Sequence, residues 1–209
     1  MKLTPRDFDI LETLTRRVRL LTVWQVARIW WPNAKSQCHC RRRIESLVRA
    51  GLIEMLSICV HPLLPVDKPL FRWKPGATEP DAERIATTCQ KRWSKPDRPL
   101  TVCVATPRSA NVFGSTACGT PPVEHRNHDL RLADVYGRYR REWPELAATW
   151  IGEHALPRAG YRIKDPDAFL CDADGSVRFV IESAGRYSTE QVQSFHDHCA
   201  EYDLPYELW

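Results

Sequence analysis

The chain has 209 residues, of which 43% are hydrophobic, and this length accommodates one or two domains with packed cores. No apolar run approaches the ~18 residues that a membrane-spanning helix requires. The first residues, MKLTPRDFDILE, lack the apolar stretch of a signal peptide. We therefore expect a cytoplasmic protein with no membrane partner, in which the eight scattered cysteines are reduced thiols.

The net charge of +4 conceals a strong asymmetry along the chain. Residues 1–74 hold 14 Lys and Arg against 6 Asp and Glu, which gives +8. Residues 165–209 hold 2 against 10, which gives −8. A basic segment gains affinity for nucleic acids by releasing the counterions condensed on phosphates, whereas an acidic segment repels them. The first third of the chain is thus the part that the composition assigns to a nucleic-acid partner.

Three short helices are predicted in the basic segment. The first covers residues 5–17, where Thr4 is the N-cap and Pro5 stands at the first helical position. The second covers Leu20–Trp31, and Pro32 ends it. The third follows a Ser36 cap and ends before Gly51, which suits the left-handed residue after a helix.

The third helix separates an apolar face from a basic face. The apolar face recurs at helical spacing and holds Cys40, Ile44, Leu47 and Val48. The other face carries side chains of the types that bind base edges and phosphates, which are Gln37, His39, Arg41, Arg42, Arg43 and Arg49. The alternative is an ordinary solvated surface helix, and the flanking segments favour DNA binding.

Two strands, Leu52–Val60 and Leu70–Trp73, are predicted to form a hairpin after the third helix. Prolines in the loop between them restrict these strands to an edge. Lys68 and Arg72 would contact the DNA backbone from this hairpin. Three helices followed by such a hairpin resemble a winged helix-turn-helix, and residues 1–74 are therefore predicted to be a winged-helix domain that binds double-stranded DNA.

Residues 75–100 are predicted to be a helical connector, with a helix at 81–94 that joins the domains, packs on the first, or forms a homodimer contact. A zinc site at Cys38, His39 and Cys40 is disfavoured, because three consecutive side chains fan around a helix. A longer helix is predicted over Val123–Trp143, where His125 and His128 are either helix-end packing groups or metal ligands.

A second hairpin is predicted around Asp174-Gly175, a turn sequence flanked by two apolar runs. If these two residues form the loop, the residue numbers of two paired positions add up to 349. Asp167 then lies opposite Glu182. A four-residue loop gives a sum of 347 and moves Glu182 two residues along the same face. Two carboxylates at this separation repel each other unless a proton or a divalent cation lies between them. Asp167 and Glu182 are therefore candidate ligands of Mg²⁺ or Mn²⁺.

Pro166-Asp167, a hairpin, and then Glu182 resemble the motif of the restriction-endonuclease-like PD-(D/E)XK fold. The resemblance implies that the two acids hold Mg²⁺ beside the scissile phosphate. The lysine of that motif stands two residues after the second acid, where this chain has Ala184. Together with His128-Asp129-Leu130 and the winged-helix segment, the arrangement is similar to the replication-relaxation family of mobile-element proteins.

The sequence thus predicts an α+β protein, with an N-terminal winged helix-turn-helix followed over residues 101–209 by a degenerate restriction-endonuclease-like α/β domain. The favoured function is a sequence-specific DNA-binding regulator or replication accessory of mobile elements, with no required cofactor. The alternative is a Mg²⁺-dependent DNA endonuclease in which Asp167, Glu182 and Glu153 are catalytic. A third hypothesis is an interaction module whose acidic tail recruits a partner.

Overall fold

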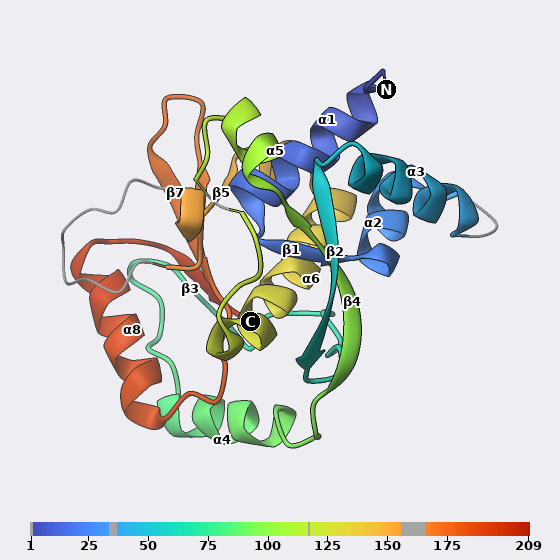
Figure 1. Ribbon diagram of the computed structural model, residues 1–209. Helices are drawn as coiled ribbons and strands as arrows, with labels where there is room; N and C mark the ends of the chain where they lie inside the picture. The colour runs from blue at the N-terminus through green and yellow to red at the C-terminus, as the bar shows by residue number, and fades with distance from the viewer. Residues whose placement is uncertain (1, 34–36, 117, 156–165) are drawn as a thin grey trace.

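The computed structural model describes residues 2–33, 37–116, 118–155 and 166–209. Within these ranges the protein is of the α+β class, as expected, with eight α-helices, one three-stranded antiparallel sheet and one five-stranded mixed sheet (Figure 1). Ser36, which was predicted to cap the third helix, lies outside the described residues. None of the described helices has both the length and the apolar character needed to cross a lipid bilayer.

The three-stranded sheet has the order β1-β4-β2, formed by β1 (Leu20–Thr22), β4 (Arg98–Ala105) and β2 (Ile53–Val60). The helices α1 (Pro5–Glu12), α2 (Val23–Trp30) and α3 (Cys38–Arg49) occur in the predicted order, and a π-helical turn, η1 (Thr13–Arg17), extends α1. Thr4 and Asp7 form a capping box at the start of α1, so the predicted cap is confirmed. The start of the second predicted helix is corrected, because its first three residues form strand β1.

The predicted wing hairpin is wrong in its second strand. Strand β2 pairs over its whole length with β4, from Ile53 opposite Ala105 to Val60 opposite Arg98. Strand β3 (Phe71–Trp73) instead pairs with β8 (Tyr206–Leu208) in the other sheet. The chain between β2 and β4 therefore leaves the first sheet, contributes β3 to the second, and returns through α4 (Ala82–Arg92). The predicted boundary at residue 74 lies between β3 and α4, and the predicted boundary at residue 100 lies within β4.

The five-stranded sheet has the order β3-β8-β7-β6-β5. Its remaining strands are β5 (Trp150–Gly152), β6 (Ala168–Cys171) and β7 (Val177–Glu182). Strands β5, β6 and β7 are antiparallel neighbours, whereas β7 and β8 are parallel and are connected through α8 (Thr189–Glu201). One face of this sheet packs against α4 and α8, in an apolar cluster that includes Val180, Phe195 and Tyr206.

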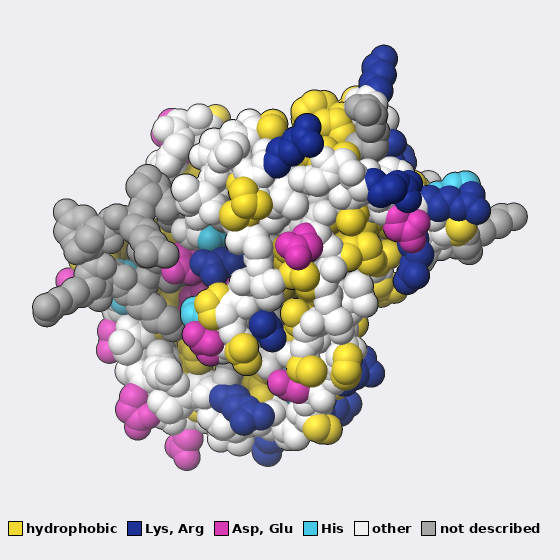
Figure 2. Space-filling model, viewed as in Figure 1, with side chains coloured by type: hydrophobic (Ala, Val, Ile, Leu, Met, Phe, Trp, Pro, Cys, Tyr) yellow, Lys and Arg dark blue, Asp and Glu magenta, His cyan; other side chains and the backbone are white. Residues whose placement is uncertain are grey.

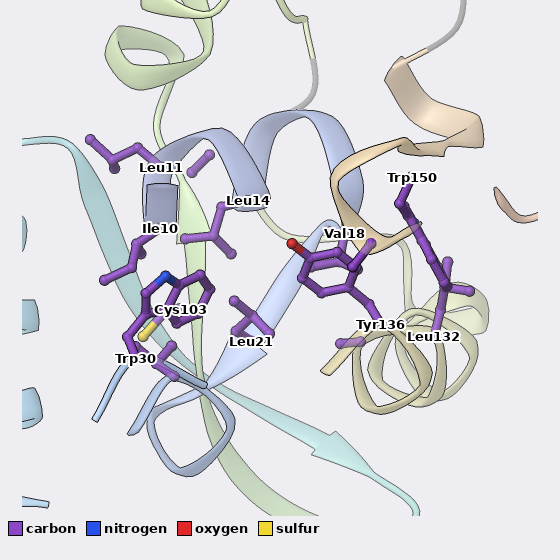
Figure 3. Packing of buried hydrophobic residues seen from close by; sticks show 14 of the residues in the cluster. Ile10, Leu11, Leu14, Val18, Leu21, Trp30, Cys103, Leu132, Tyr136 and Trp150 are labelled. Carbon is purple, nitrogen blue, oxygen red and sulfur yellow. The ribbon is translucent and has the colours of Figure 1, made fainter. Parts of the chain in front are cut away.

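Helix α6 (Arg126–Glu142) lies between the two sheets and connects their cores (Figure 1). A short 3-10 turn, η2 (Val123–His125), precedes it, and the short helices α5 (Pro107–Val112) and α7 (Pro144–Ala148) lie on either side along the chain. Leu132 and Tyr136 of α6 pack with Leu14 and Leu21 on one side and with Trp150 on the other (Figure 3). This single apolar cluster extends from Ile10 near the N-terminus to Trp209. The two sheets thus share one continuous core.

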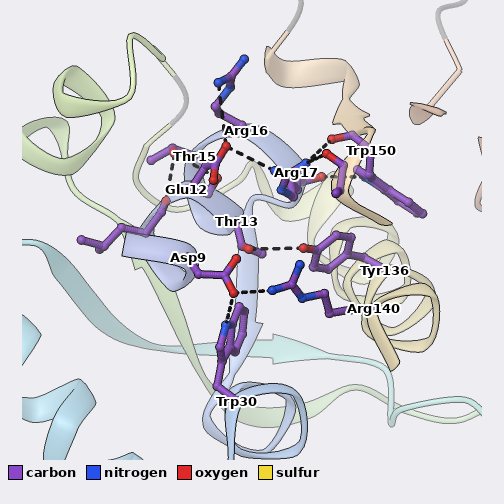
Figure 4. Close-up of polar contacts among 12 residues, drawn as sticks. Asp9, Glu12, Thr13, Thr15, Arg16, Arg17, Trp30, Tyr136, Arg140 and Trp150 are labelled. Carbon is purple, nitrogen blue, oxygen red and sulfur yellow. Dashed lines mark hydrogen bonds and ion pairs between the residues drawn. The ribbon is translucent and has the colours of Figure 1, made fainter. Parts of the chain in front are cut away.

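Polar contacts also connect the N-terminal helices with α6 and β5 (Figure 4). Asp9 accepts hydrogen bonds from Trp30 Nε1 at 2.8 Å and from the guanidinium of Arg140 on α6. Arg17 donates from Nη1 to the carbonyl of Trp150 at 2.9 Å, and Trp150 Nε1 donates to the carbonyl of Arg17 at 3.0 Å. These bonds connect α1, η1, α6 and β5, which come from distant parts of the chain.

Candidate functional site

Helix α3 has one buried face and one exposed face, as the sequence predicts. Cys40, Ile44 and Leu47 are fully buried in the core. The polar side chains that were predicted to contact DNA are exposed, and they are Gln37, His39, Arg41, Arg42 and Arg49. Figure 2 shows dark blue side chains and a histidine gathered over α3. The exposed face of α3 is therefore a candidate nucleic-acid interface.

Arg43 is positioned differently from its neighbours. Its Nε donates to Asp7 Oδ1 at 2.7 Å, and its Nη2 donates to the other oxygen of the same carboxylate and to the carbonyl of Lys2. The Asp7 side chain is fully buried. Burial opposes ionisation of Asp7, but the hydrogen bonds from Arg43 and Thr4 outweigh it and lower the pKa of the carboxyl. Arg43 thus fastens α3 to α1 instead of facing solvent.

Lys68 and Arg72 do not lie on a wing. Lys68 is exposed on the segment that leads from β2 to the second sheet. Arg72 lies on β3, where its Nε donates to Glu207 Oε1 at 2.7 Å. Glu207 also accepts hydrogen bonds from Tyr139 Oη at 2.6 Å and from Trp209 Nε1 at 2.9 Å. Lys68 and Arg72, which were predicted to contact the DNA backbone, are therefore not on a hairpin beside α3.

Beside the two acids, the strands of the second hairpin pair as predicted, because the residue numbers of paired positions add up to 349. Ala168 pairs with Ile181, and Phe169 pairs with Val180. The turn differs from both predicted loops, because the backbone N–H of Asp172 donates to Ser176 O, and Cys171 pairs with Val177. A bulge between Leu170 and Cys171 then restores the predicted register. Asp167 and Glu182 follow on the face that Phe169 and Val180 share, since side chains alternate along strands.

Asp167 is held by a histidine and by the backbone. Its Oδ2 accepts a hydrogen bond from the backbone N–H of Ser183 at 2.6 Å and lies 2.6 Å from His128 Nε2. The other ring nitrogen, Nδ1, lies 3.2 Å from Asp129 Oδ1. Burial favours the neutral imidazole, but the negative charges of Asp167 and Asp129 outweigh this effect and raise the pKa of His128 well above 6.5. The contacts with Asp167 and Asp129 thus favour the charged form of His128.

Glu182 is fully buried at the end of β7 and accepts a hydrogen bond from the phenol of Tyr187. Burial raises the pKa of Tyr187, and the charges of Glu182 and Asp167 raise it further. Both acids therefore act on one phenol, which places them in the same polar cluster. We name this group, formed by His128, Asp129, Asp167, Glu182 and Tyr187, the acid cluster.

Glu153, the predicted third acid, begins the 3-10 turn η3 (Glu153–Ala155), and its backbone N–H donates to the carbonyl of Asp167 at 3.0 Å. Its side chain is exposed, whereas the neighbouring His154 lies deeper. Burial and the charge of Arg19 together lower the pKa of His154 to about 4. His154 is thus neutral at pH 7.

The arrangement does not fit a resident divalent cation as it stands. In the part of the chain that the structure describes, no three His, Cys, Asp or Glu side chains form a group that could hold a metal ion. Asp167 Oδ2 already contacts His128 Nε2, and the charged imidazole that this contact favours would repel a cation. Ala184 is buried beside α4, and Arg186 donates to the carbonyl of Trp93 at 2.6 Å. Metal binding by Asp167 and Glu182 stays a prediction that requires His128 to release Asp167.

Sequence reasoning identified Asp167 and Glu182 but missed the residues that surround them. His128 and Asp129 were visible as a histidine-acid pair at the start of a long helix, and His128 was considered only as a metal ligand or packing group. Nothing in the local sequence marks Tyr187 or His154. Comparison of the chain with protein-family models, curated proteins and solved structures gave no match.

Proposed function

We propose that this protein binds double-stranded DNA sequence-specifically through the exposed face of α3. The observation that carries the proposal is the division of α3 into a buried apolar face and a solvent-facing set that includes Gln37, Arg41, Arg42 and Arg49. Arginine and glutamine are the side chains that form paired hydrogen bonds with guanine and adenine in the major groove. The order α1-β1-α2-α3-β2-β4 supports a winged-helix origin, in which the excursion to the second sheet would replace the wing.

We further infer that the second sheet belongs to a restriction-endonuclease-like unit that does not cleave DNA. This inference follows the resemblance to the replication-relaxation family. The order α6-β5-β6-β7-α8-β8, with Asp167 and Glu182 at adjoining strand ends, supports the nuclease-like ancestry. Two features argue against cleavage: His128 Nε2 occupies Asp167, and Ala184 stands where the motif has its lysine, so little would stabilise the developing charge. The protein is then a regulator or replication accessory of mobile elements.

The DNA proposal is tested by fluorescence anisotropy on duplexes selected from a random pool, measured over a range of salt concentrations. The double variant Arg41→Gln/Arg42→Gln should lower affinity and flatten the salt slope by about 2, because each lost phosphate contact removes roughly 0.9. Arg178→Gln is the matched control, since Arg178 is an exposed arginine on β7 in the second sheet. Equal loss in the control, or no loss in the double variant, would exclude α3 as the interface.

An endonuclease is the second candidate, and the register that aligns Asp167 with Glu182 favours it. Calorimetric titration with Mn²⁺, combined with a plasmid cleavage assay, separates the two readings. We expect no efficient cleavage and, at most, weak Mn²⁺ binding that Asp167→Asn abolishes while DNA affinity stays intact. Metal-dependent cutting that disappears in Asp167→Asn would establish the enzyme instead.

A further inference from the structure

Two adjoining hollows lie beside α2, away from the acid cluster. The inner hollow has a volume of about 300 Å³ and lies between α2, α6 and residues 63–67. The outer hollow has a volume of about 430 Å³ and continues along α2 to Gln37, immediately before α3. Trp24, Arg28 and Arg141 line both, so the two form one site with two compartments. Their size falls within the range of about 300–1,000 Å³ that small-molecule pockets occupy.

The outer compartment is suited to an anion. Arg28 and Arg141 both line it, and none of the described residues that line it is acidic. Neither guanidinium forms an ion pair with any residue that the structure describes. Burial lowers the pKa of Arg141, and the nearby positive charge of Arg28 lowers it further, although Glu142 and Asp134 offset part of this repulsion between the two cations. An anionic group between them would relieve this repulsion, and guanidinium groups bind phosphate oxygens in pairs.

The inner compartment is suited to a hydrogen-bond donor. Asp67 and Asp134 both line it, and Asp134 accepts a hydrogen bond on Oδ1 from Gln25 Nε2 at 2.7 Å. Its other oxygen, Oδ2, accepts no hydrogen bond from the described residues. A half-buried carboxylate oxygen with spare acceptor capacity favours an N–H or NH₂ group. The acidic side chains therefore distinguish the inner compartment from the outer one, whereas Arg28 and Arg141 line both.

An aromatic surface lies at the junction. Trp24 is 43% exposed, which is unusual for a tryptophan, and the guanidinium of Arg28 lies 5.0 Å from the centre of its ring. The exposed ring offers an apolar face on which a planar heterocycle can stack. Stacking here would leave the ring edge of the ligand directed at Asp134 and its anionic end near Arg28 and Arg141.

We propose that this cleft binds a nucleoside monophosphate. The phosphate lies between Arg28 and Arg141, the heterocycle packs against Trp24, and an N–H or amino group on the base donates to Asp134. This chemistry is shared by a free mononucleotide and by a nucleotide within a single strand, and we assign the site to the free mononucleotide because the inner compartment, which Pro65 and Val66 help to line, has a volume of only about 300 Å³. Binding does not depend on whether α3 binds DNA.

The test is isothermal titration of the full chain with AMP, CMP, GMP and UMP, with adenosine and inorganic phosphate as partial ligands. At least one nucleotide should bind with 1:1 stoichiometry, and tenfold or more tightly than either partial ligand. Arg28→Gln and Arg141→Gln should each weaken this binding at least tenfold. Both side chains are exposed, so the variants are expected to fold, which a thermal unfolding curve checks. Asp134→Asn should weaken nucleotide binding but leave that of inorganic phosphate unchanged.

The controls separate this site from the DNA interface. Arg41→Gln/Arg42→Gln should keep nucleotide affinity, and Arg28→Gln should keep the salt slope of duplex binding. The proposal is overturned if no nucleotide binds at millimolar concentration, if inorganic phosphate binds as tightly as any nucleotide, or if Arg28→Gln/Arg141→Gln leaves binding unchanged. Tighter binding of a short single strand than of any mononucleotide, lost in the same variants, would assign the cleft to nucleic acid and also overturn it.

Discussion

Adjacent arginines on α3 have opposite roles. Arg42 is exposed, whereas Arg43 neutralises the buried carboxylate of Asp7. The sequence could not separate them, because both lie in one basic run and the partner of Arg43 is 36 residues away. Helical spacing predicts the apolar face of α3. Only the packing of α1 against α3 determines which arginine forms an ion pair within the protein.

We expect Arg43→Gln to lower the free energy of unfolding by about 2 kcal/mol, because it removes hydrogen bonds to a charged group that stays buried. Arg42→Gln should change it by less than about 0.5 kcal/mol, as is usual for an exposed surface position. Urea unfolding of the two variants measures the difference. Equal stabilities would show that the Arg43–Asp7 contact contributes little.

His128 should make the free energy of unfolding decrease as the pH rises above neutrality. Its folded pKa lies well above 6.5, so its stabilising contribution is complete below the unfolded pKa of roughly 6.5 and is lost as pH rises through the folded value. The difference in unfolding free energy between the wild type and His128→Gln should therefore be largest at pH 6 and shrink toward pH 9. Urea titrations at each pH test this, and a difference that does not vary with pH would contradict it.

The elements themselves were more accessible to sequence reasoning than their partners. The helices α3, α4 and α6 were expected from caps and apolar spacing, and these signals are local. Strand pairing was not local, because β2 joins β4 across an insertion that contains β3 and α4. One signal was available: the continuous apolar run TVCVA of β4 is typical of a central strand buried on both faces. Strand β3, beside prolines, lies at a sheet edge, as its sequence indicated.

The register of the acid hairpin shows how a correct prediction can rest on a different turn. Gly175 has a φ of +86°, as the turn requires, but the observed loop is neither of the two that were weighed. The bulge beside Leu170 compensates for the extra loop residue. Sequence periodicity fixes which side chains share a face, whereas bulges depend on the twist of the assembled sheet.

Gly152 is the position in β5 where a side chain should be least tolerated. A Cβ there would lie 2.6 Å from the carbonyl oxygen of Arg17 and 2.6 Å from Cε1 of His154. Gly152→Ala should therefore lower the free energy of unfolding by roughly 1–3 kcal/mol, because the backbone of η1 cannot move away freely. Gly185→Ala is the matched control, since a Cβ there meets nothing within 4 Å. Thermal unfolding of both variants decides, and equal melting temperatures would refute the clash.

At the scale of the molecule, charge is distributed between two ends. The basic face of α3 and the acidic helix α8 lie on opposite sides of the view in Figure 1. This separation corresponds to the +8 and −8 segments of the sequence. An approaching polyanion is attracted to the α3 end and repelled from the α8 end, which orients the protein before contact.

The shared core predicts that the basic segment does not fold alone. A fragment of residues 1–74 lacks β4, the central strand of the first sheet, and also lacks α6, whose Leu132 and Tyr136 complete the core around Leu14 and Leu21. We expect this fragment to show no cooperative unfolding transition by circular dichroism, whereas the full chain unfolds cooperatively. A folded fragment that binds duplex DNA would restore the boundary at residue 74.

The position of β8 between β3 and β7 has a consequence for biosynthesis. Residues 206–208 leave the ribosome after every other described strand, yet they occupy an interior place in the sheet. Strand β3 must wait for more than 130 further residues, on the order of 10 s at typical elongation rates, before its partner exists. During that interval the edge of β3 is open to wrong pairing, and so is that of β7 once it has been synthesised, so we expect the nascent chain to bind a chaperone that shields unpaired strands.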